Sequence, residues 1–453
     1  MTRTVLSSTD AGGRAGTGVE TRTSGDRTDL SAALVRRLPA AAEALDPRLA
    51  AERVRAWLAG ADPRGTGPAP QVEVGSVLYR DDGSLTLRYL VRAGDHPGQP
   101  PTLLVSVPAD GGSIGLRAFP DDPGLPTLAA AVTPAAAAQM LRRTLPPVGR
   151  DRWLADCRVA VVHHPRQGAC VLRYDLLPSS TANAELPFSR VFAKVYASAA
   201  EARRAATATG ALVRATRRAD GSLVLPDVLG VDDNLAVLVL SAVPGRTPTP
   251  AAGADAAGRA LAALHASDVG PGTGLPGADR ECVLARLDRQ LAVVATVWPD
   301  VAERVEALAR HAMSRGLATA PEPLVPSHGD LTPSQLLLDG DGAGPEGSVG
   351  LVDLDGACLA EPASDAGRYL AYLDAALVAA GLSPGSLTLP RPGRRFVETC
   401  LEGRGRAGEN PRDVLEQVRM YRSLNLALMA LSAARRLKRR RLLTALSLLQ
   451  TAC

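Results

Sequence analysis

The chain lacks several features, and each absence narrows its class. Its six cysteines show no paired spacing of the kind that holds zinc or forms a redox pair. It shows no secretory hydrophobic segment, and its longest apolar runs, such as 235–243, are too short to cross a bilayer. We therefore expect a cytoplasmic protein with free thiols and no membrane partner.

Aromatic residues and lysine are also scarce. Aromatics make up 3% of the 453 residues, so Leu, Val and Ala must fill the interior of a chain long enough for two or three domains. Lysine occurs only at positions 194 and 438, and the other 49 of the 51 basic residues are Arg. Lys194 lies in an alternating stretch, 190–196, that predicts a strand. A role in contacting phosphates would explain a lysine here, and an exposed edge-strand lysine is the alternative.

The most informative pattern that is present spans residues 327–355. It begins Ser-His-Gly-Asp, continues through an apolar stretch and a Gly-rich turn, and ends Leu-Val-Asp-Leu-Asp. This order predicts a loop, a strand, a turn and a second strand. Asp330 is placed to accept a proton from a hydroxyl group, while Gln335 and Asp353 are placed to bind a divalent ion, as phosphoryl transfer requires.

The His-Gly-Asp tripeptide alone is a weak signal, because Gly and Asp are common in turns. Metallophosphoesterases contain similar pieces, but they need several more metal ligands. The chain has six histidines, and none besides His328 lies near the motif. The spacing of the whole stretch therefore favours a phosphotransferase.

The stretch resembles the active-site signature of the aminoglycoside phosphotransferase and choline kinase-like family, a small-molecule branch of the protein-kinase fold. The resemblance extends over roughly residues 155–445, and the family usually has Asn where this chain has Gln335. Some sugar kinases of the family, maltokinases among them, look similar in using Gln. The resemblance implies catalysis by Asp330 and metal binding by Gln335 and Asp353, with Asp355 helping to hold a second ion.

The resemblance also implies the fold class, an α+β, two-lobed protein-kinase-like fold with an extra N-terminal α+β module. We predict a disordered tail (1–28), a cap-like module (29–148), a β-rich N-lobe (149–242) and an α-rich C-lobe (243–453). The module would start with two short helices within 30–58, followed by a hairpin of strands 72–79 and 84–91 around an Asp-Asp-Gly turn.

The expected nucleotide site draws on several segments. A hairpin turn containing Gly168 would cover the phosphates, although it lacks a Gly-x-Gly-x-x-Gly pattern, and Lys194 would contact them. Glu201 is either the carboxylate partner of Lys194 or a first-turn acid that favours its helix. The apolar strand 234–241 leads into a hinge, so the base would bind the backbone near Leu240 and Ala242.

Three further residues have predicted structural roles. His328 would buttress the catalytic loop, and Asp365 would cap a helix at 366–379 and brace the same loop. We predict that His265 packs within its helix.

The charge distribution bears on the acceptor. Segment 391–441 carries fourteen basic and five acidic residues, a local charge of +9, whereas the whole chain carries +4. The run 435–441 is either an anion-binding patch or the solvated face of a terminal helix, and it lacks the aromatics typical of single-strand nucleic-acid sites. A nucleic-acid partner is therefore not expected, and the positive charge favours a sugar over a polycationic aminoglycoside.

We predict an ATP- or GTP-dependent phosphotransferase that uses Mg²⁺ and phosphorylates a hydroxyl group of a small molecule, with a sugar or aminosugar favoured. Three alternatives stay open: a Ser/Thr kinase acting on a precursor peptide, a nucleotide-binding pseudokinase and an aminoglycoside resistance kinase.

Overall fold

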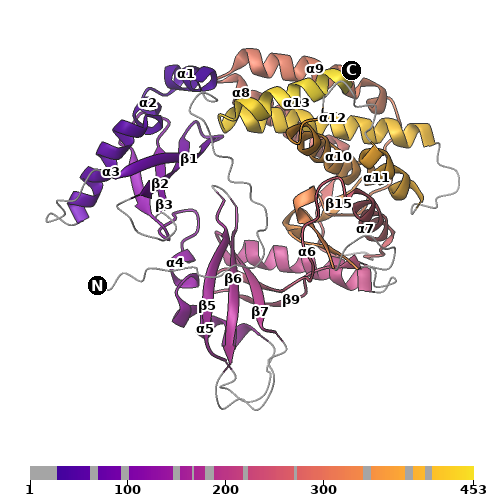
Figure 1. Cartoon of the computed structure of the whole chain (residues 1–453). Coiled ribbons are helices and arrows are strands. Elements are labelled where there is room, and N and C mark those ends of the chain that lie inside the picture. Colours follow the sequence, from indigo (N-terminus) through magenta and orange to yellow (C-terminus); the bar gives the residue numbers. More distant parts are fainter. Residues whose placement is uncertain are drawn as a thin grey trace.

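The computed structural model is a mixed α+β fold in two lobes, with further elements at the N-terminal side (Figure 1). It describes residues 28–61, 70–92, 102–145, 154–165, 168–178, 188–217, 223–269, 273–339, 348–382, 391–402 and 411–452. The predicted tail, 1–28, lies outside these residues except for Thr28, which begins the first helix.

The N-lobe is a five-stranded antiparallel sheet with strand order β5-β6-β7-β10-β9, crossed on one face by helix α6. Strand β6 alternates buried and half-buried residues along its length, as expected for a strand with one face in the core. The predicted strand at 234–241 is shorter than expected, because the chain turns at Ala236 before β10. The elements are β5 (Leu154–His163), β6 (Cys170–Pro178), β7 (Arg190–Val195), α6 (Ala199–Arg217), β9 (Val228–Asp232) and β10 (Val237–Ser241).

Two N-terminal helices, α4 (Leu128–Ala131) and α5 (Pro134–Thr144), cover the other face of this sheet. Met140 and Leu141 of α5 share a core with Leu172 and Val239 of the strands. The tyrosine hydroxyl of Tyr174 donates to a backbone carbonyl of α4 at 2.9 Å. Both faces of the N-lobe sheet are therefore packed.

The C-lobe is mainly helical and lies at the top and right of Figure 1. Its longest helix, α12, packs against α8, α9, α10 and α13. The helices are α7 (Ala254–Ala266), α8 (Arg280–Ala295), α9 (Pro299–Leu317), α10 (Pro362–Ala379), α11 (Arg391–Glu402), α12 (Pro411–Arg435) and α13 (Arg439–Ala452). None of the helices within the described ranges is both long and apolar enough to cross a membrane.

The first part of the chain packs on the C-lobe, with α1 beside α8 and α9 (Figure 1). The indole of Trp298, which caps α9, donates to the carbonyl of Leu30 at 3.0 Å, and Arg435 donates to the carbonyl of Tyr79 at 2.8 Å. Three helices form where two were predicted, because a short one is inserted between them. The elements are α1 (Thr28–Arg37), α2 (Ala41–Leu45), α3 (Pro47–Ala61), β1 (Gln71–Tyr79), β2 (Leu85–Arg92), β3 (Thr102–Val107) and β4 (Gly115–Ala118), and the four strands form a meander.

Short strands between the two lobes position the motif at 327–355. Strand β12 pairs with β15, β13 pairs with β14, and β8 joins β14 in parallel. These elements are β8 (Leu223–Val224), β11 (Gly277–Ala278), β12 (Val325–Ser327), the 3-10 turn η2 (Pro333–Gln335), β13 (Leu336–Leu338), β14 (Val349–Leu351), the 3-10 turn η3 (Leu354–Gly356) and β15 (Cys358–Ala360). Asp330 thus precedes the β13–β14 hairpin and Asp353 follows it.

Candidate active site

The loop that carries Asp330 is tightly constrained. Gly329 has a φ of +73°, and a side-chain carbon added there would lie 1.9 Å from the carbonyl oxygen of Gly356. Only glycine fits this conformation and this close approach. The loop therefore lies directly against the turn that follows Asp353.

Asp365 holds this loop in place through hydrogen bonds to its backbone. Its fully buried carboxylate accepts hydrogen bonds from the backbone N–H groups of His328 at 2.7 Å and Gly329 at 2.8 Å. Burial raises the pKa of Asp365, but the neighbouring His265 outweighs this effect, so the pKa lies below its ordinary value. The buried ring of His328 contacts the carbonyl of Val352 at 3.1 Å, beside the second strand.

The predicted capping role of Asp365 is wrong. Helix α10 begins at Pro362, so Asp365 lies inside its first turn, and Glu361 occupies the N-cap position. The proline at the first helical position sets the helix start earlier than the sequence pattern indicated. The Asp365 carboxylate contacts the loop instead.

Lys194 on β7 reaches across to two carboxylates. Its ammonium donates to Asp353 at 2.5 Å and to Asp355 at 2.7 Å, and the hydroxyl of Tyr196 donates to Asp355 at 2.9 Å. Burial lowers the pKa of Lys194, but the Coulombic attraction of the two carboxylates outweighs it and leaves the pKa raised. The ammonium is therefore charged, and it occupies a position between two oxygen ligands that a cation favours.

Glu201 does not share this contact. The interactions given for Lys194 involve Asp353 and Asp355, whereas Glu201 lies in the first turn of α6, where its N–H is bonded to the hydroxyl of Ser198 at 3.3 Å. Of the two predicted alternatives, the structure favours the first-turn acid.

Asp353 has a strained backbone, with a left-handed φ of +71°. Non-glycine residues rarely adopt this conformation, and such strain is concentrated at functional sites. Burial raises the pKa of Asp353, but Lys194 and a hydrogen bond from Gln335 lower it by more, so the pKa lies below its ordinary value. The carboxylate is therefore ionised at neutral pH. Its side chain is 48% exposed and accessible to a ligand.

Gln335 completes a capping box with Thr332. Its Oε1 accepts from the N–H of Thr332 at 2.8 Å, and its amide nitrogen donates to Oδ2 of Asp353 at 3.3 Å. In this arrangement the amide orients Asp353 and does not present a free oxygen toward it. Metal binding by Gln335 thus stays a prediction.

The residues nevertheless suit a magnesium ion. Asp353 and Asp355 converge on one cation, the Lys194 ammonium, and carboxylate oxygens together with substrate phosphates are the usual ligands of Mg²⁺. No group of three or more His, Cys, Asp or Glu side chains able to hold a metal occurs within the described ranges, so the phosphates would have to supply ligands.

Sequence reasoning missed the partner of Asp330. The guanidinium of Arg368 on α10 forms an ion pair with Oδ1 of Asp330 and also donates to Asn425 at 3.2 Å. Arg368 follows Asp365 by three residues, so both side chains lie on one face of the helix. Because Asp365 was predicted to brace the loop, the three-residue helical spacing could have indicated that Arg368 also faces it.

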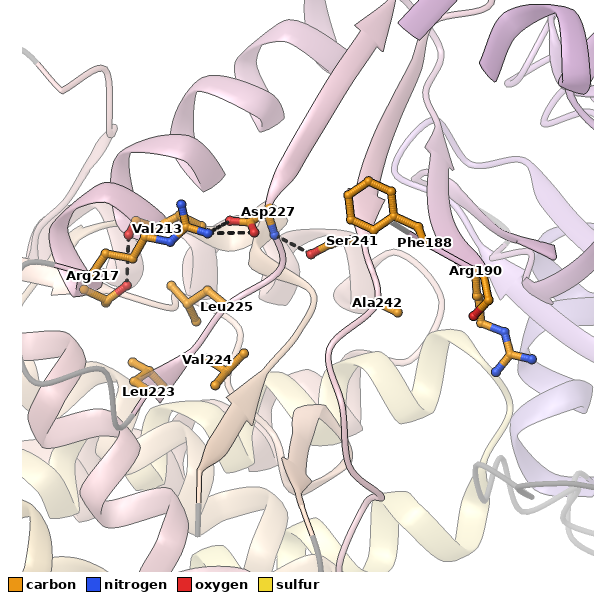
Figure 2. A pocket seen from close by; sticks show the side chains of 12 residues that line it. Phe188, Arg190, Val213, Arg217, Leu223, Val224, Leu225, Asp227, Ser241 and Ala242 are labelled. Carbon is orange, nitrogen blue, oxygen red and sulfur yellow. Dashed lines mark hydrogen bonds and ion pairs between the residues drawn. The ribbon is translucent and has the colours of Figure 1, made fainter. Parts of the chain in front are cut away.

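A pocket of about 560 Å³ adjoins the hinge (Figure 2). Its walls include the end of α6, segment 223–227, Ser241 and Ala242, and the N–H of Asp227 donates to the Ser241 hydroxyl at 2.8 Å. Ala242 lines the pocket, whereas Leu240 is buried against α6, and binding of the base at these residues stays a prediction. Lys194 does not line the pocket.

Gly168 lies at the hairpin between β5 and β6 with a φ of +95° and open space around it. The two residues before it, 166–167, lie outside the described residues. The predicted contact between this turn and nucleotide phosphates stays a prediction.

Comparison with known proteins agrees with this geometry. Residues 181–395 match the model of the phosphotransferase enzyme family, which confirms the resemblance predicted from the motif. The match identifies the chain as a phosphotransferase with a hydroxyl group as acceptor, and it implies a nucleotide as donor. Asp330, predicted for catalysis, and Asp353, predicted for metal binding, lie within the matched stretch.

Among curated proteins, none matches the chain. Similar solved structures include the GDP and kanamycin complex of APH(2")-IIia (14% identity, TM-score 0.46, covering 70% of this chain and 97% of that one). They also include a Plasmodium vivax ethanolamine kinase (11% identity, TM-score 0.40, covering 66% of this chain and 82% of that one). A third is a choline/ethanolamine kinase family protein from Mesorhizobium loti (16% identity, TM-score 0.36, covering 62% of this chain and 98% of that one).

Proposed function

We propose that the chain transfers the γ-phosphoryl group of ATP or GTP to a hydroxyl group of a small molecule, with a sugar or aminosugar favoured. The observation that carries the proposal is the convergence of Lys194, Asp353 and Asp355 on one side of the loop that bears Asp330. This arrangement brings a phosphate-binding cation, two candidate metal ligands and a candidate base together, as phosphoryl transfer requires.

The donor nucleotide would extend from the hinge to Lys194. The pocket beside Ser241 and Ala242 is large enough for part of a ligand, because ligand pockets typically measure about 300–1,000 Å³. Arg190, which also lines it, lies four residues before Lys194 on β7, a span of roughly 13 Å along the strand. The base would then occupy the pocket, and the phosphates would lie near the ammonium.

Asp353 and Asp355 would hold Mg²⁺, and Gln335 would keep Asp353 oriented. Bound magnesium supplies neutralisation of charge on the transferring phosphates. Lys194 would move from the carboxylates to the phosphates when the nucleotide binds, since both sites attract the same ammonium. This exchange requires that the carboxylates stay ionised, which the lowered pKa of Asp353 favours.

Asp330 would position the acceptor hydroxyl and accept its proton. Its Oδ1 contacts Arg368, while Oδ2 has no hydrogen-bond partner among the described residues and is available to the hydroxyl. The side chain is 43% exposed, so an acceptor can reach it. The presence of Lys194, Asp330 and Asp353 in one site argues against the pseudokinase alternative, and no observation favours a precursor peptide.

The test is nucleotide-dependent phosphorylation of a panel of hydroxyl compounds by the wild type and by Asp330→Asn. We expect the variant to lose about 10²–10⁴-fold in kcat, the usual contribution of a positioned acid or base, and to keep its affinity for MgATP. Asp339→Asn, at an exposed aspartate nine residues later, is the matched control and should keep full activity. Near-normal turnover in Asp330→Asn would contradict the proposed mechanism.

A further inference from the structure

A group of arginines lies on the acceptor side of Asp330. We call the four side chains Arg286 of α8, Arg368 of α10, Arg436 after α12 and Arg441 of α13 the arginine cluster. Arg436 and Arg441 come from the basic run 435–441, which the sequence left open as an anion site or a solvated face. The chain turns between α12 and α13 at Leu437, whose φ is +53°, and Arg441 reaches Tyr372 of α10.

Tyr372 on α10 joins the members of the cluster. The guanidinium carbon of Arg368 lies 5.2 Å from the centre of its ring, and that of Arg441 lies 5.6 Å away. Both distances allow a cation–π contact. Arg286 and Arg436 lie close enough to Tyr372 for its hydroxyl group to influence their pKa values. Side chains from three segments of the C-lobe therefore meet around one ring.

The positive charge of the cluster is poorly balanced. Arg286 is exposed as a whole residue, but partial desolvation of its guanidinium lowers its pKa and the neighbouring Arg368 lowers it further. Desolvation likewise lowers the pKa of Arg436, and Arg441 adds to the effect. Among the described residues, the one carboxylate that interacts with these guanidinium groups is Asp330. Like charges held together in this way are unfavourable unless an anion joins them.

Two members also have unused hydrogen-bond donors. The Nε atoms of Arg368 and Arg436 are buried and have no hydrogen-bond partner. The adjacent Arg435 differs, because it donates to Tyr79, Gln290 and Asp81 and joins the C-lobe to β1. Arg435 is thus structural, whereas the cluster has free donors and excess charge beside the candidate base.

We propose that the acceptor carries an oxyanion, a carboxylate or phosphate group, which the arginine cluster binds while Asp330 receives the hydroxyl. Guanidinium groups suit this task because their N–H donors match the paired oxygens of both anions. The proposal deepens the proposed function and rests on it. The proposal also separates this acceptor from polycationic compounds such as aminoglycosides, which an acidic pocket would bind.

The nucleotide phosphates are a less suitable occupant. Lys194 and its carboxylates lie on the N-lobe side of the loop, whereas the cluster reaches the loop through Arg368 and α10. The acceptor must approach Asp330 opposite the phosphates, because attacking and leaving oxygens are roughly in line. The cluster therefore lies where the acceptor would bind.

The closing experiment compares four acceptors with one carbon frame and different charge: glucose, glucosamine, gluconate and glucose 6-phosphate. Each is tested as a phosphoryl acceptor from ATP with the wild type. We expect gluconate or glucose 6-phosphate to have the highest kcat/KM, by about tenfold or more, and the better of the two identifies the anion. A higher kcat/KM with glucose or glucosamine would overturn the proposal.

Three variants locate the effect. Arg286→Gln and Arg436→Gln should each raise KM for the preferred anionic acceptor about tenfold with little change in kcat, because each removes a charged hydrogen bond. Arg440→Gln, at an exposed arginine next to Arg441, is the matched control and should leave KM unchanged. Equal effects in all three variants would show only a general loss of charge and would overturn the proposal.

Anion binding provides a second readout that needs no acceptor turnover. Sulfate is titrated at constant ionic strength into protein saturated with Mg²⁺ and a non-hydrolysable ATP analogue, and melting temperature is recorded. The sulfate concentration for a half-maximal shift should rise about tenfold in Arg436→Gln but not in Arg440→Gln. Equal curves would overturn the anion site.

The two proposals fail differently. Transfer to glucose that is unaffected by the cluster variants would refute the anionic acceptor and leave the kinase activity standing. Transfer to none of the acceptors, with sulfate binding that depends on Arg436, would support the anion site and count against the proposed function.

Discussion

Replacing Asp365 should loosen the catalytic loop. Its carboxylate accepts from two buried backbone N–H groups, those of His328 and Gly329. An unsatisfied buried donor costs about 1–3 kcal/mol, so Asp365→Ala, which orphans both, should lower the free energy of unfolding by about 2–6 kcal/mol. Asp365→Asn keeps one acceptor oxygen and should lose roughly half as much, about 1–3 kcal/mol. Removal of a buried charge opposes part of this loss.

The assay is urea unfolding of the wild type and both variants, with the midpoint and slope fitted separately. Asp288→Asn, at an exposed aspartate of α8, is the matched control and should change stability by less than about 0.5 kcal/mol. Activity should fall with stability, because the same bonds hold Asp330 in place. A loss below about 1 kcal/mol in Asp365→Ala, with full activity, would refute the reasoning.

The pH dependence of the difference in unfolding free energy between the wild type and Asp365→Asn is a further check. The folded-state pKa of Asp365 lies below its ordinary value, because the neighbouring His265 and the loop bonds outweigh burial. The stabilisation by the carboxylate is therefore fully present above the unfolded pKa, about 3.9, and is lost as pH falls through the lower folded value. The difference in unfolding free energy between wild type and Asp365→Asn should therefore shrink as pH falls below about 4.

Three other changes should have distinct effects. Gly329→Ala should lower the free energy of unfolding by at least about 2 kcal/mol and reduce activity, because the added carbon would overlap a backbone oxygen at a residue with positive φ. Gly277→Ala, where the added carbon would meet open space, is the control, and equal stability of the two variants would contradict this prediction. Lys194→Met removes the cation between two carboxylates, so MgCl₂ alone should raise its melting temperature more than that of the wild type; equal shifts would argue against a shared cation site. Trp298→Ala should cost about 3–5 kcal/mol in urea unfolding, because the indole is 4% exposed and bonded to Leu30; a loss under 1 kcal/mol would show that α1 docks independently of it.

Much of the fold could be predicted from local patterns. Strand β6 alternates buried and half-buried residues, and β7 forms within the alternating stretch 190–196 that predicted a strand. The candidate catalytic loop could be located because Asp330, Gln335 and Asp353 lie in one short stretch of sequence, and its catalytic role stays a prediction. The helix start at Pro362 was missed, because a proline signal competed with an acidic residue that suits a cap position.

Long-range contacts could not be predicted in this way. Nothing in the sequence near Lys194 indicates that Asp353 and Asp355, about 160 residues later, are its partners in place of Glu201. The N-terminal segment shows the same limit: α1 to β4 pack on the C-lobe and α4 and α5 pack on the N-lobe sheet, yet one module was predicted for 29–148. Its boundaries therefore stay a prediction.

Helix α10 connects the catalytic loop with the arginine cluster. Asp365, Arg368 and Tyr372 follow one another at spacings of three and four residues, so they lie on one face of the helix. The first holds the loop, the second contacts Asp330, and the third contacts two arginines. Because a helix moves as a rigid unit, a change that shifts the first turn of α10 should alter the position of the base and the anion site together. Asp365→Asn should thus raise KM for the acceptor as well as lower kcat, whereas Asp330→Asn should lower kcat alone.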